Sequence, residues 1–389
     1  MKTVVIVGGG PAGMMLAYQL ASNGIGVRVL ERHPDFEREF RGELVQGSNV
    51  EQLKKAGIFQ KLVERGAAIP DVERRMFVGP TRQVQIPGPQ EKGAIVSQPA
   101  FLSLLHEACS AFPHYRLDFS SAVTEALVEN GRVVGVKTKT QELKGDLVVV
   151  TNGRNSPLRR SFGLETETFE TTADALWLRF DFSQAKEALP STVDVHMFGR
   201  GVVMVTQPSG NHRLHIAYSS AEDLAALKRD LPKLKERLLP TLNEPLRSVV
   251  GAQLSEQTEM QVLKIIVDRV KSWHAPGILF LGDAAHTMSP SGGQGLNVAL
   301  RDTYVAANVL IPALQKNEEL ALQSIQDERM PEIAAIQAGQ TRAGQMVLKP
   351  AGVLHLMMSI MGVMMFFMGA KLRKGHGIPM PEPRFLKPL

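Results

Sequence analysis

The stretch VVIVGGGPAG, Val4–Gly13, decides the fold, because it joins a short apolar run to a cluster of glycines and then to a helical pattern. Residues 3–7 are β-branched, which predicts a parallel strand buried on both faces. Residues 11–23 have helical spacing, and residues 27–30 form a second apolar run. The sequence therefore predicts a βαβ unit of about 30 residues.

The glycines of this stretch have the spacing G-x-G-x-x-G between the strand and the helix. One glycine permits the tight turn, one lets the backbone approach a pyrophosphate, and one lets the helix pack on the strand. Glu31 ends the second strand, close to the spacing of about 20 residues at which an acid binds ribose hydroxyls. We therefore expect a dinucleotide at the helix N-terminus, bound by Gly8, Gly10, Pro11, Ala12, Gly13 and Glu31.

Length and composition limit the class of protein. A chain of 389 residues with 44% hydrophobic residues has enough material for two domains or one large interleaved unit. The net charge of +5 is mild and spread along the chain, and 6% aromatic residues are too few for a platform that stacks single-stranded nucleic acid. We expect no nucleic-acid partner. The single cysteine, Cys109, excludes an internal disulfide and a Cys-cluster metal site, so a reducing cytoplasm is the simplest compartment.

The sequence pattern changes from strands that alternate with helices to successive strands. Between residues 173 and 220, four strand-like runs follow one another without a crossover helix, which predicts an antiparallel meander. The fold class is therefore α/β: a Rossmann-like cofactor domain with an inserted, mainly antiparallel sheet domain that binds substrate. The boundaries that we predict are 1–70, 95–168 and 268–340 for the cofactor domain, 71–94 and 169–267 for the sheet domain, and 341–389 for a helical, apolar C-terminal segment.

The C-terminal segment contains an unusual apolar run. Residues 351–370 carry no charge and are flanked by Lys349, Lys371, Arg373 and Lys374. The length reaches the threshold of roughly 18 residues for a membrane-spanning helix, but three glycines and a histidine weaken that interpretation. A buried helix, or a surface helix in peripheral contact with a membrane, fits better.

A second glycine-rich stretch lies far from the first. The sequence LFLGDAAHTMSPSGGQGLNVALRD, Leu279–Asp302, begins as a buried strand, continues through small residues and ends as a helix. Asp283, at the strand end, is placed to accept hydrogen bonds from hydroxyl groups. Gly292, Gly293 and Gly295 let backbone N–H groups approach a ligand without a Cβ clash. A helix N-terminus there would favour a negatively charged ring.

These motifs resemble those of the class A flavoprotein monooxygenases, the FAD-dependent aromatic hydroxylases with the para-hydroxybenzoate hydroxylase fold. Three segments carry the resemblance: Gly8–Gly13 with Glu31 and Arg32, the stretch NGRNSPLRR at residues 152–160, and GDAAHTMSPSGGQGLN at residues 282–297. The third match is long and gapless, and the three together spread the resemblance from the N-terminus to about residue 340.

The resemblance assigns roles to individual residues. Asp283 would bind the sugar chain of FAD, and the loop from Pro290 to Asn297 would lie beside the isoalloxazine ring, with Arg41, Pro290 and Gly293 nearest the reacting atoms. For Arg41 a solvated loop cation is the alternative. For Gln98 the alternative is a polar side chain that only satisfies local backbone groups at the start of a helix. The further cofactor contacts implied by the resemblance are Arg32, Arg41, Gln98, Val123, Gly295, Leu296 and Asn297.

The second motif departs from the family pattern. Asn152 stands where the family has Asp, whereas Gly153, Ser156 and Arg159 match. Asn keeps a hydrogen-bond acceptor but loses the charge, so an arginine held by that carboxylate would be held less firmly. The segment is linked in the family to both FAD and NAD(P)H. Only one G-x-G-x-x-G is present, so NADPH or NADH would bind transiently, without a Rossmann unit of its own.

The resemblance implies a single-component monooxygenase. NAD(P)H would reduce FAD, O2 would add at the flavin C4a carbon, and the resulting hydroperoxide would transfer one oxygen to a hydrophobic, aromatic small molecule. An FAD-dependent reductase or dehydrogenase acting on a quinone or prenyl lipid is the alternative, and a flavoprotein that uses FAD only for structure is a third interpretation. A halogenase is disfavoured because Trp177 and Trp273 are far apart in the sequence. The chain is expected to be a monomer or a dimer.

The histidines do not indicate a metal site. Their spacing matches no ligand pattern, so we predict none. Within its motif His286 is expected to be structural. For His196 and His215, in the inserted sheet, a hydrogen-bonded sheet histidine is favoured over contact with substrate. The C-terminal methionines are assigned to helix packing or membrane contact, with a pliable substrate pocket as the alternative.

Overall fold

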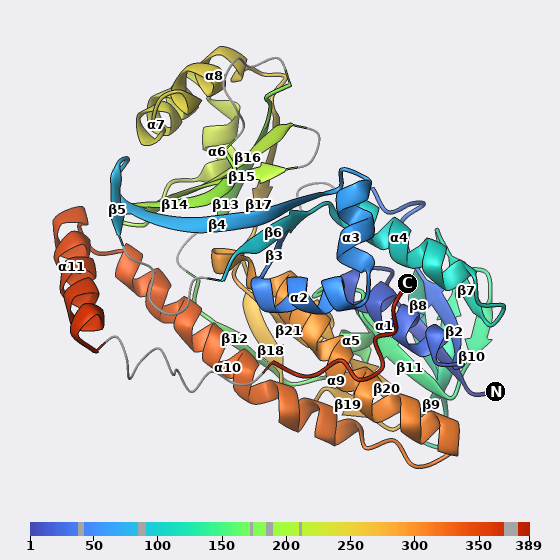
Figure 1. Ribbon diagram of the computed structural model, residues 1–389. Coiled ribbons are helices and arrows are strands. Elements are labelled where there is room, and N and C mark those ends of the chain that lie inside the picture. The colour runs from blue at the N-terminus through green and yellow to red at the C-terminus, as the bar shows by residue number, and fades with distance from the viewer. Residues whose placement is uncertain (38–42, 85–90, 172–173, 184–189, 210–211, 369–379) are drawn as a thin grey trace.

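The computed structural model describes residues 1–37, 43–84, 91–171, 174–183, 190–209, 212–368 and 380–389, without the side chains of Ser291 and 361–368. Two bodies lie side by side in Figure 1. One is an α/β layer structure that contains the N-terminus, and the other is a large curved sheet covered by short helices. The long strand β4 (Ala68–Val78) leads from the first body into the second.

A mostly parallel sheet forms the centre of the first body. Its strand order is β19-β20-β11-β1-β2-β7, and the pairs β20·β11, β11·β1, β1·β2 and β2·β7 are parallel. Val4 to Val7 are buried, as the β-branched run predicts for a strand covered on both faces. The strands are β1 (Thr3–Val7), β2 (Gly26–Leu30), β7 (Tyr115–Asp118), β11 (Leu147–Val150), β19 (His274–Ala275) and β20 (Ile278–Phe280).

Helices from distant parts of the chain cover this sheet. α1 packs against both α4 and α9, and α9 in turn packs against α10. α1 is buried over most of its length, including Met14, Met15 and Leu16. Two shorter helices, α2 and α3, pack on each other beside the sheet. The helices are α1 (Pro11–Ser22), α2 (Gly47–Lys55), α3 (Ile58–Glu64), α4 (Gln98–Ser110), α5 (Pro157–Ser161), α9 (Gln294–Lys316) and α10 (Leu322–Val347).

The second body is built on a nine-stranded sheet of order β17-β13-β16-β15-β14-β4-β6-β3, with β5 paired to β4. The prediction of a simple meander over residues 173–220 is wrong in its pairing. β14, β15 and β16 do follow one another, but β13 pairs with β16 and β17, and β14 pairs in parallel with β4. Strands from the N-terminal half thereby cover an edge that a four-stranded meander would leave open.

The strands of this sheet are β3 (Leu44–Val45), β4 (Ala68–Val78), β5 (Arg82–Val84), β6 (Gly93–Val96), β13 (Ala175–Asp181), β14 (Thr192–Gly199), β15 (Val202–Ser209), β16 (Arg213–Ser219) and β17 (Glu259–Leu263). Short helices cover one face: α6 (Leu224–Arg229), α7 (Leu231–Leu238), η1 (Leu239–Thr241) and α8 (Leu246–Gln253). The helices are short because Pro232, Pro240 and Pro245 each lie at the start of a new helix.

Two small sheets complete the first body. β8 (Val123–Glu129) and β9 (Arg132–Thr138) form a hairpin whose turn residues, Asn130 and Gly131, both have positive φ, as is typical of an Asn-Gly turn. β10 (Glu142–Lys144) extends it. The other sheet contains β12 (Thr166–Phe169), β18 (Val267–Val270) and β21 (His286–Thr287).

The C-terminal region differs from the helical segment predicted for residues 341–389. α11 (Ala351–Met368) packs Leu354 and Met358 against Val78 and Met197 of the large sheet. The described residues 380–389 return as a non-helical tail to the first body, where the Tyr18 hydroxyl donates to the carbonyl oxygen of Lys387 at 3.0 Å. In the part of the chain that the structure describes, no helix is both long enough and apolar enough to cross a bilayer.

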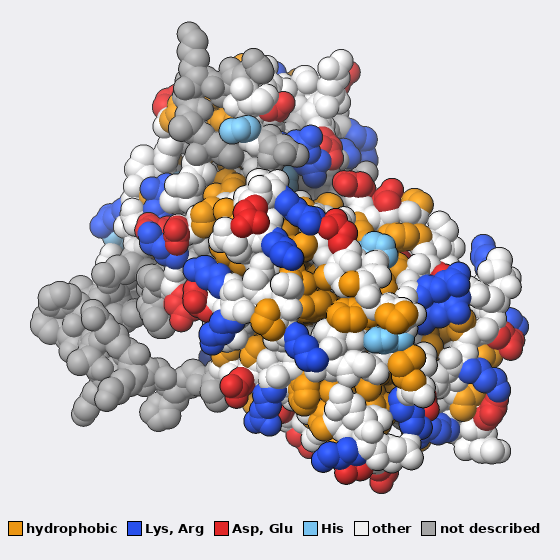
Figure 2. Space-filling view, turned by 45° about the vertical axis from the view of Figure 1, so that its right-hand side comes forward, with side chains coloured by type: hydrophobic (Ala, Val, Ile, Leu, Met, Phe, Trp, Pro, Cys, Tyr) orange, Lys and Arg blue, Asp and Glu red, His pale blue; other side chains and the backbone are white. Residues whose placement is uncertain are grey.

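The surface in Figure 2 carries Lys and Arg side chains intermixed with Asp and Glu, with apolar atoms between them. This distribution agrees with a mild net charge of +5 that is spread along the chain. Cys109 is buried in α4, and burial raises the pKa of its thiol.

Candidate functional site

The first glycine turn lies between β1 and α1, as the sequence predicts. Gly8 has φ +112°, and a Cβ atom there would lie 2.7 Å from the Asn152 backbone. A Cβ atom on Gly13 would lie 2.0 Å from the carbonyl oxygen of Gly8. The spacing of the motif is therefore required by the fold itself, because no larger residue fits at either position.

The N-terminus of α1 has the features of an anion site. Its N-cap residue, Gly10, has no side chain to accept a hydrogen bond from the first turn, and Pro11 and Ala12 begin the helix. The free N–H groups and the helix dipole there favour a phosphate group. Glu31 is buried at the end of β2, where its carboxylate accepts hydrogen bonds from the backbone N–H groups of Gly9 (2.7 Å) and His33 (3.0 Å). Arg32 beside it is exposed.

The second glycine turn lies between β20 and α9. Asp283 is exposed in the short helix η2 (Gly282–Ala284), directly after the strand end. Pro290 is exposed at the N-cap of η3 (Ser291–Gly293). Gly292 and Gly293 have φ of +78° and +62°, and α9 begins at Gln294 without a side-chain cap. This second helix N-terminus is thus also uncapped, as expected of a backbone anion site.

The two turns, far apart in the chain, meet at Gly282. A Cβ atom on Gly282 would lie 3.5 Å from Cβ of Ala12 in α1 and 3.4 Å from Cβ of Ala299 in α9. The Gly282 turn therefore packs between the first turn of α1 and the second turn of α9 through small residues.

The side chain of Asn297 has a structural role that the sequence did not predict. Its side chain is fully buried and accepts hydrogen bonds from the backbone of Gln46 and the side chain of Asn49, both at 2.8 Å. Its amide donates to the carbonyl oxygens of Leu44 (2.9 Å) and Gly293 (2.7 Å). The side chain holds the glycine loop against β3 and α2, so a ligand contact at this residue would come from its backbone.

The remaining residues that we predicted to contact the cofactor lie in different environments. Gln98, Leu296 and Val45 line one small apolar hollow between α4, α9 and β3. A Cβ atom on Gly295 would meet no other atom within 4 Å, which leaves the backbone of this residue open to a ligand. Val123 is buried at the start of β8. Arg41 lies outside the described residues.

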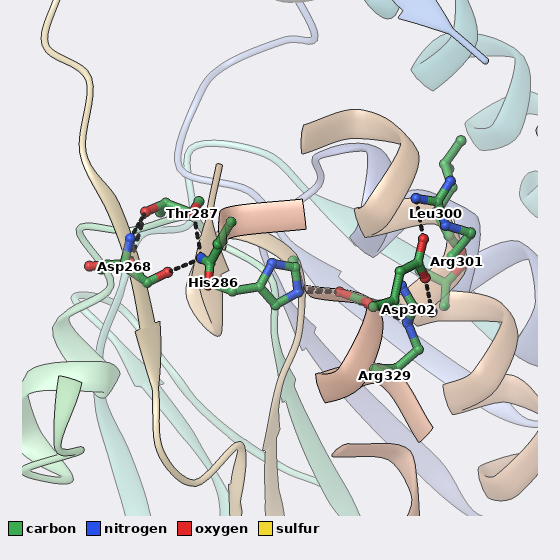
Figure 3. A network of polar contacts seen from close by, with 11 residues as sticks. Asp268, His286, Thr287, Leu300, Arg301, Asp302 and Arg329 are labelled. Carbon is green, nitrogen blue, oxygen red and sulfur yellow. Dashed lines mark hydrogen bonds and ion pairs between the residues drawn. The ribbon is translucent and has the colours of Figure 1, made fainter. Parts of the chain in front are cut away.

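A buried network, which the sequence did not predict, supports the second turn (Figure 3). Asp302 of α9 is fully buried, and its carboxylate contacts Nε2 of His286 at 2.7 Å and Nε of Arg329 at 2.9 Å. The same carboxylate accepts the N–H of Gly282 at 3.1 Å. Burial alone would raise the pKa of Asp302, but His286 and Arg329 outweigh it and hold the pKa below its usual value. His286 is thus structural, as expected.

The Asn152 motif has an arrangement of its own. Arg159, which we expected to be held less firmly, makes a buried ion pair with Asp268 of β18 at 2.8 Å. Thr287 donates to the same carboxylate at 2.8 Å. Arg159 is therefore held by Asp268, which no local sequence signal identifies. Oδ1 of Asn152 is buried without a hydrogen-bond partner among the described residues, and it lies at the Gly8 turn.

Comparison with known proteins identifies the family. A family model described as an FAD binding domain matches residues 1–339, which is most of the chain. The chain belongs to this FAD binding domain family. The resemblance to class A flavoprotein monooxygenases is therefore confirmed, and an FAD-dependent monooxygenase of the aromatic hydroxylase type is the assignment that the family supports.

Individual relatives agree with this assignment. The 6-methylpretetramide 4-monooxygenase of Streptomyces rimosus is 29% identical over 376 residues, which cover 90% of this chain and 85% of that protein. Among solved structures, a mutant of Pseudomonas aeruginosa PqsL has a TM-score of 0.79 at 20% identity, covering 91% of this chain and 99% of that one. The p-nitrophenol 4-monooxygenase PnpA of Pseudomonas putida has a TM-score of 0.76 at 18% identity, with 96% of each chain covered. The two structures share the fold of this flavoprotein.

The site fits FAD by its own geometry. The Gly8–Gly13 turn has backbone N–H groups that would bind the pyrophosphate, Asp283 has a carboxylate that would bind the sugar hydroxyls, and the loop before α9 has backbone N–H groups that would face the ring. In the described part of the chain, no group of three or more His, Cys, Asp or Glu residues could hold a metal ion.

Replacing Asp283 by Ala tests the sugar-binding role. We expect purified Asp283→Ala to retain less FAD than the wild type, because a hydrogen-bond acceptor for the ribitol hydroxyls is lost, at a cost of about 1 kcal/mol or more. The ratio of flavin to protein absorbance after gel filtration measures it. Glu256→Ala, at an exposed turn of the sheet domain, is the matched control. Equal flavin content in both variants would remove Asp283 from the site.

Replacing Asp302 by Asn tests the buried network. The Asp302→Asn variant leaves Arg329 with less compensating charge in the interior, so we expect the free energy of unfolding in urea to fall by about 3–5 kcal/mol. Glu328→Gln, at an exposed position of α10, is the control.

The loss of stability in Asp302→Asn should depend on pH. Because the pKa of Asp302 is lowered in the folded protein, its stabilising contribution is present above the unfolded pKa and is lost as the pH falls. The difference in stability between wild type and Asp302→Asn should therefore shrink on acidification. A difference that grows at low pH contradicts the assignment.

Proposed function

We propose that this protein is an NAD(P)H-dependent FAD monooxygenase that uses O2 to hydroxylate a hydrophobic, aromatic small molecule. The observation that carries the proposal is that the Gly282 turn packs against both α1 and α9, two helices whose N-termini have no side-chain cap. When bound, FAD supplies the oxygen-transferring chemistry at its C4a carbon. The protein supplies orientation, exclusion of water and stabilisation of negative charge on the ring by the N-terminus of α9.

The same geometry supports a site for the substrate. The large sheet turns one face toward the first body, where Leu44 lies within contact distance of Gly293. We assign substrate binding to this face, in line with the domain boundaries predicted from the sequence. NADPH or NADH would bind transiently. The relatives' names support an aromatic substrate, because they include a p-nitrophenol monooxygenase and a 6-methylpretetramide monooxygenase.

Oxygen incorporation tests the proposal. Purified protein should be yellow, should oxidise NADPH or NADH faster in the presence of an accepted phenol or quinolone, and should place one atom of isotopically labelled O2 in the product. Protein without flavin would contradict the proposal. Flavin-dependent reduction of a quinone without label in any product would favour the reductase alternative instead.

We also propose peripheral contact between α11 and an anionic membrane. Its buried side holds Leu354, whereas Val353, Leu356, Met357 and Ile360 on the other side are 43–61% exposed. An apolar helix face next to basic residues, here Lys349 before it and three further basic residues shortly after it in the sequence, is typical of helices that lie on anionic lipid.

Vesicle binding tests this contact. We expect wild-type protein to sediment with vesicles that contain phosphatidylserine, and Leu356→Glu with Ile360→Glu to reduce the bound fraction several-fold, because both charges would enter the lipid interface. Val128→Glu, at an exposed apolar residue of β8, is the control. If the wild type ignores vesicles and self-associates through α11 instead, the membrane proposal fails and a dimer explains the exposed face.

A further inference from the structure

One face of the large sheet carries a buried polar cluster that the fold does not need for its core. Side chains alternate along a strand, so residues two apart share a face. On β15, Met204 packs under α6–α8, and Gln207 and Ser209 lie on the opposite face. On β13 and β16, Arg179 and His215 are paired on that same face, with Nε of Arg179 at 3.1 Å from Nε2 of His215.

We call these side chains the polar face: Trp177, Arg179, Gln207, Ser209 and His215. Four of them are at least nine-tenths buried, and Arg179 is half-buried. The indole ring of Trp177 stands edge-on to His215, with ring centroids 5.9 Å apart. On a buried face, each of these polar atoms needs a hydrogen-bond partner, from the protein or from a ligand.

Two hydrogen-bond donors on the polar face are unused. Nε2 of Gln207 and Nε1 of Trp177 are buried and have no hydrogen-bond partner among the described residues. Gln207 is 7% exposed and Trp177 is 8% exposed. Leaving such groups unpaired costs about 1–3 kcal/mol each, so their retention indicates a ligand that accepts hydrogen bonds there.

Glu43, which belongs to the cofactor domain, contacts the polar face. Its carboxylate is buried and accepts a hydrogen bond from the Ser209 hydroxyl at 2.7 Å. The next residue, Leu44, lies against Gly293 of the second glycine turn, where a Cβ atom would be 3.1 Å from the Leu44 side chain. Glu43 therefore lies between the loop assigned to the flavin ring and the face assigned to substrate.

Among the described residues, two basic side chains affect the pKa of Glu43. Arg179 from β13 and Arg213 from β16 act on its carboxylate, and Glu259 of β17 balances Arg179 at 2.8 Å. Burial raises the pKa of Glu43 to about 7 despite the Ser209 hydrogen bond and the two arginines. His215 does not titrate in the same range, because burial and the arginines lower its pKa to about 4.

We propose that Glu43, Ser209 and Gln207 form a subsite for an acidic hydroxyl group, phenolic or enolic, and that the Glu43 carboxylate takes its proton. This inference rests on the proposed function and names the substrate class and the base of that site. A hydroxyl group fits such a subsite because it can donate to the Glu43 carboxylate and accept from an unused donor such as Nε2 of Gln207.

The proton transfer is balanced within the site. The O–H bond of the substrate breaks, an O–H bond forms on the Glu43 carboxylate, and the substrate oxygen keeps the electron pair. Arg179 and Arg213, which act on the Glu43 carboxylate, would also favour the negative charge left on the substrate oxygen. An ionised hydroxyl raises the electron density of the ring carbons ortho and para to it, which are then the positions that accept an electrophilic oxygen.

Equilibrium dialysis of the protein as purified tests the subsite without turnover. The probes are 2-naphthol and its methyl ether, 2-methoxynaphthalene, which lacks the proton. In the wild type, affinity for 2-naphthol should rise as the pH rises through about 7, where Glu43 ionises, whereas affinity for the ether should not change. In Glu43→Gln, binding of 2-naphthol above pH 7 should weaken on the order of tenfold and lose this step, since a hydrogen bond to a charged acceptor is lost.

Two further variants separate titration of Glu43 from a general effect on folding. Ser209→Ala removes a donor that favours the ionised carboxylate, so the step should remain and its midpoint should move to higher pH. Glu73→Gln, on an exposed position of β4, should leave binding unchanged.

Three results would overturn the subsite: equal binding of the two probes by the wild type, a step unchanged in Glu43→Gln, or a midpoint unmoved in Ser209→Ala. Each leaves the monooxygenase proposal standing, because that depends on flavin content and on labelled oxygen in the product. Conversely, a confirmed step in protein that incorporates no oxygen would contradict only the proposed reaction.

Discussion

The packing of α1 against α9 around the Gly282 turn positions both glycine turns. Each of these helices has an N-terminus with unsatisfied N–H groups and a partial positive charge, and the Gly282 turn packs between them at Ala12 and Ala299. Like partial charges repel, so this arrangement is costly in the absence of an anion. The glycines make the approach sterically possible, and a nucleotide with a negatively charged pyrophosphate and an electron-accepting ring makes it favourable.

Buried ionic groups hold that arrangement in place. Asp302 ties the Gly282 turn to α9, and Arg329 ties α9 to α10, so both sides of the second turn are fixed by charges that water does not screen. Asp268 and Arg159 join β18 to α5 in the same way. Breaking such pairs costs far more than surface ion pairs contribute, which explains why a segment rich in glycine can still have one defined conformation.

Much of the first body was predictable from the sequence, because its signals are local. The β-branched run of β1, the glycine spacing and the Asn130-Gly131 turn each fix a backbone conformation by themselves. The pairing of β14 with β4 could not be predicted from the sequence. Alternation of apolar and polar residues predicts a strand and its buried face, but it does not identify the neighbouring strand. Asp268 and Glu43 were missed for the same reason. Their roles depend on contacts with residues more than 100 positions away, Arg159 and Ser209.

The central claim is that the two glycine turns bind opposite ends of one FAD molecule. The most direct measurement is a titration of flavin-free protein with FAD, FMN and AMP. If both turns bind, FAD should bind one to one and about 100-fold or more tighter than FMN or AMP, because each half raises the effective concentration of the other. FMN that binds as tightly as FAD would show that the Gly8–Gly13 turn takes no part, and would contradict the account.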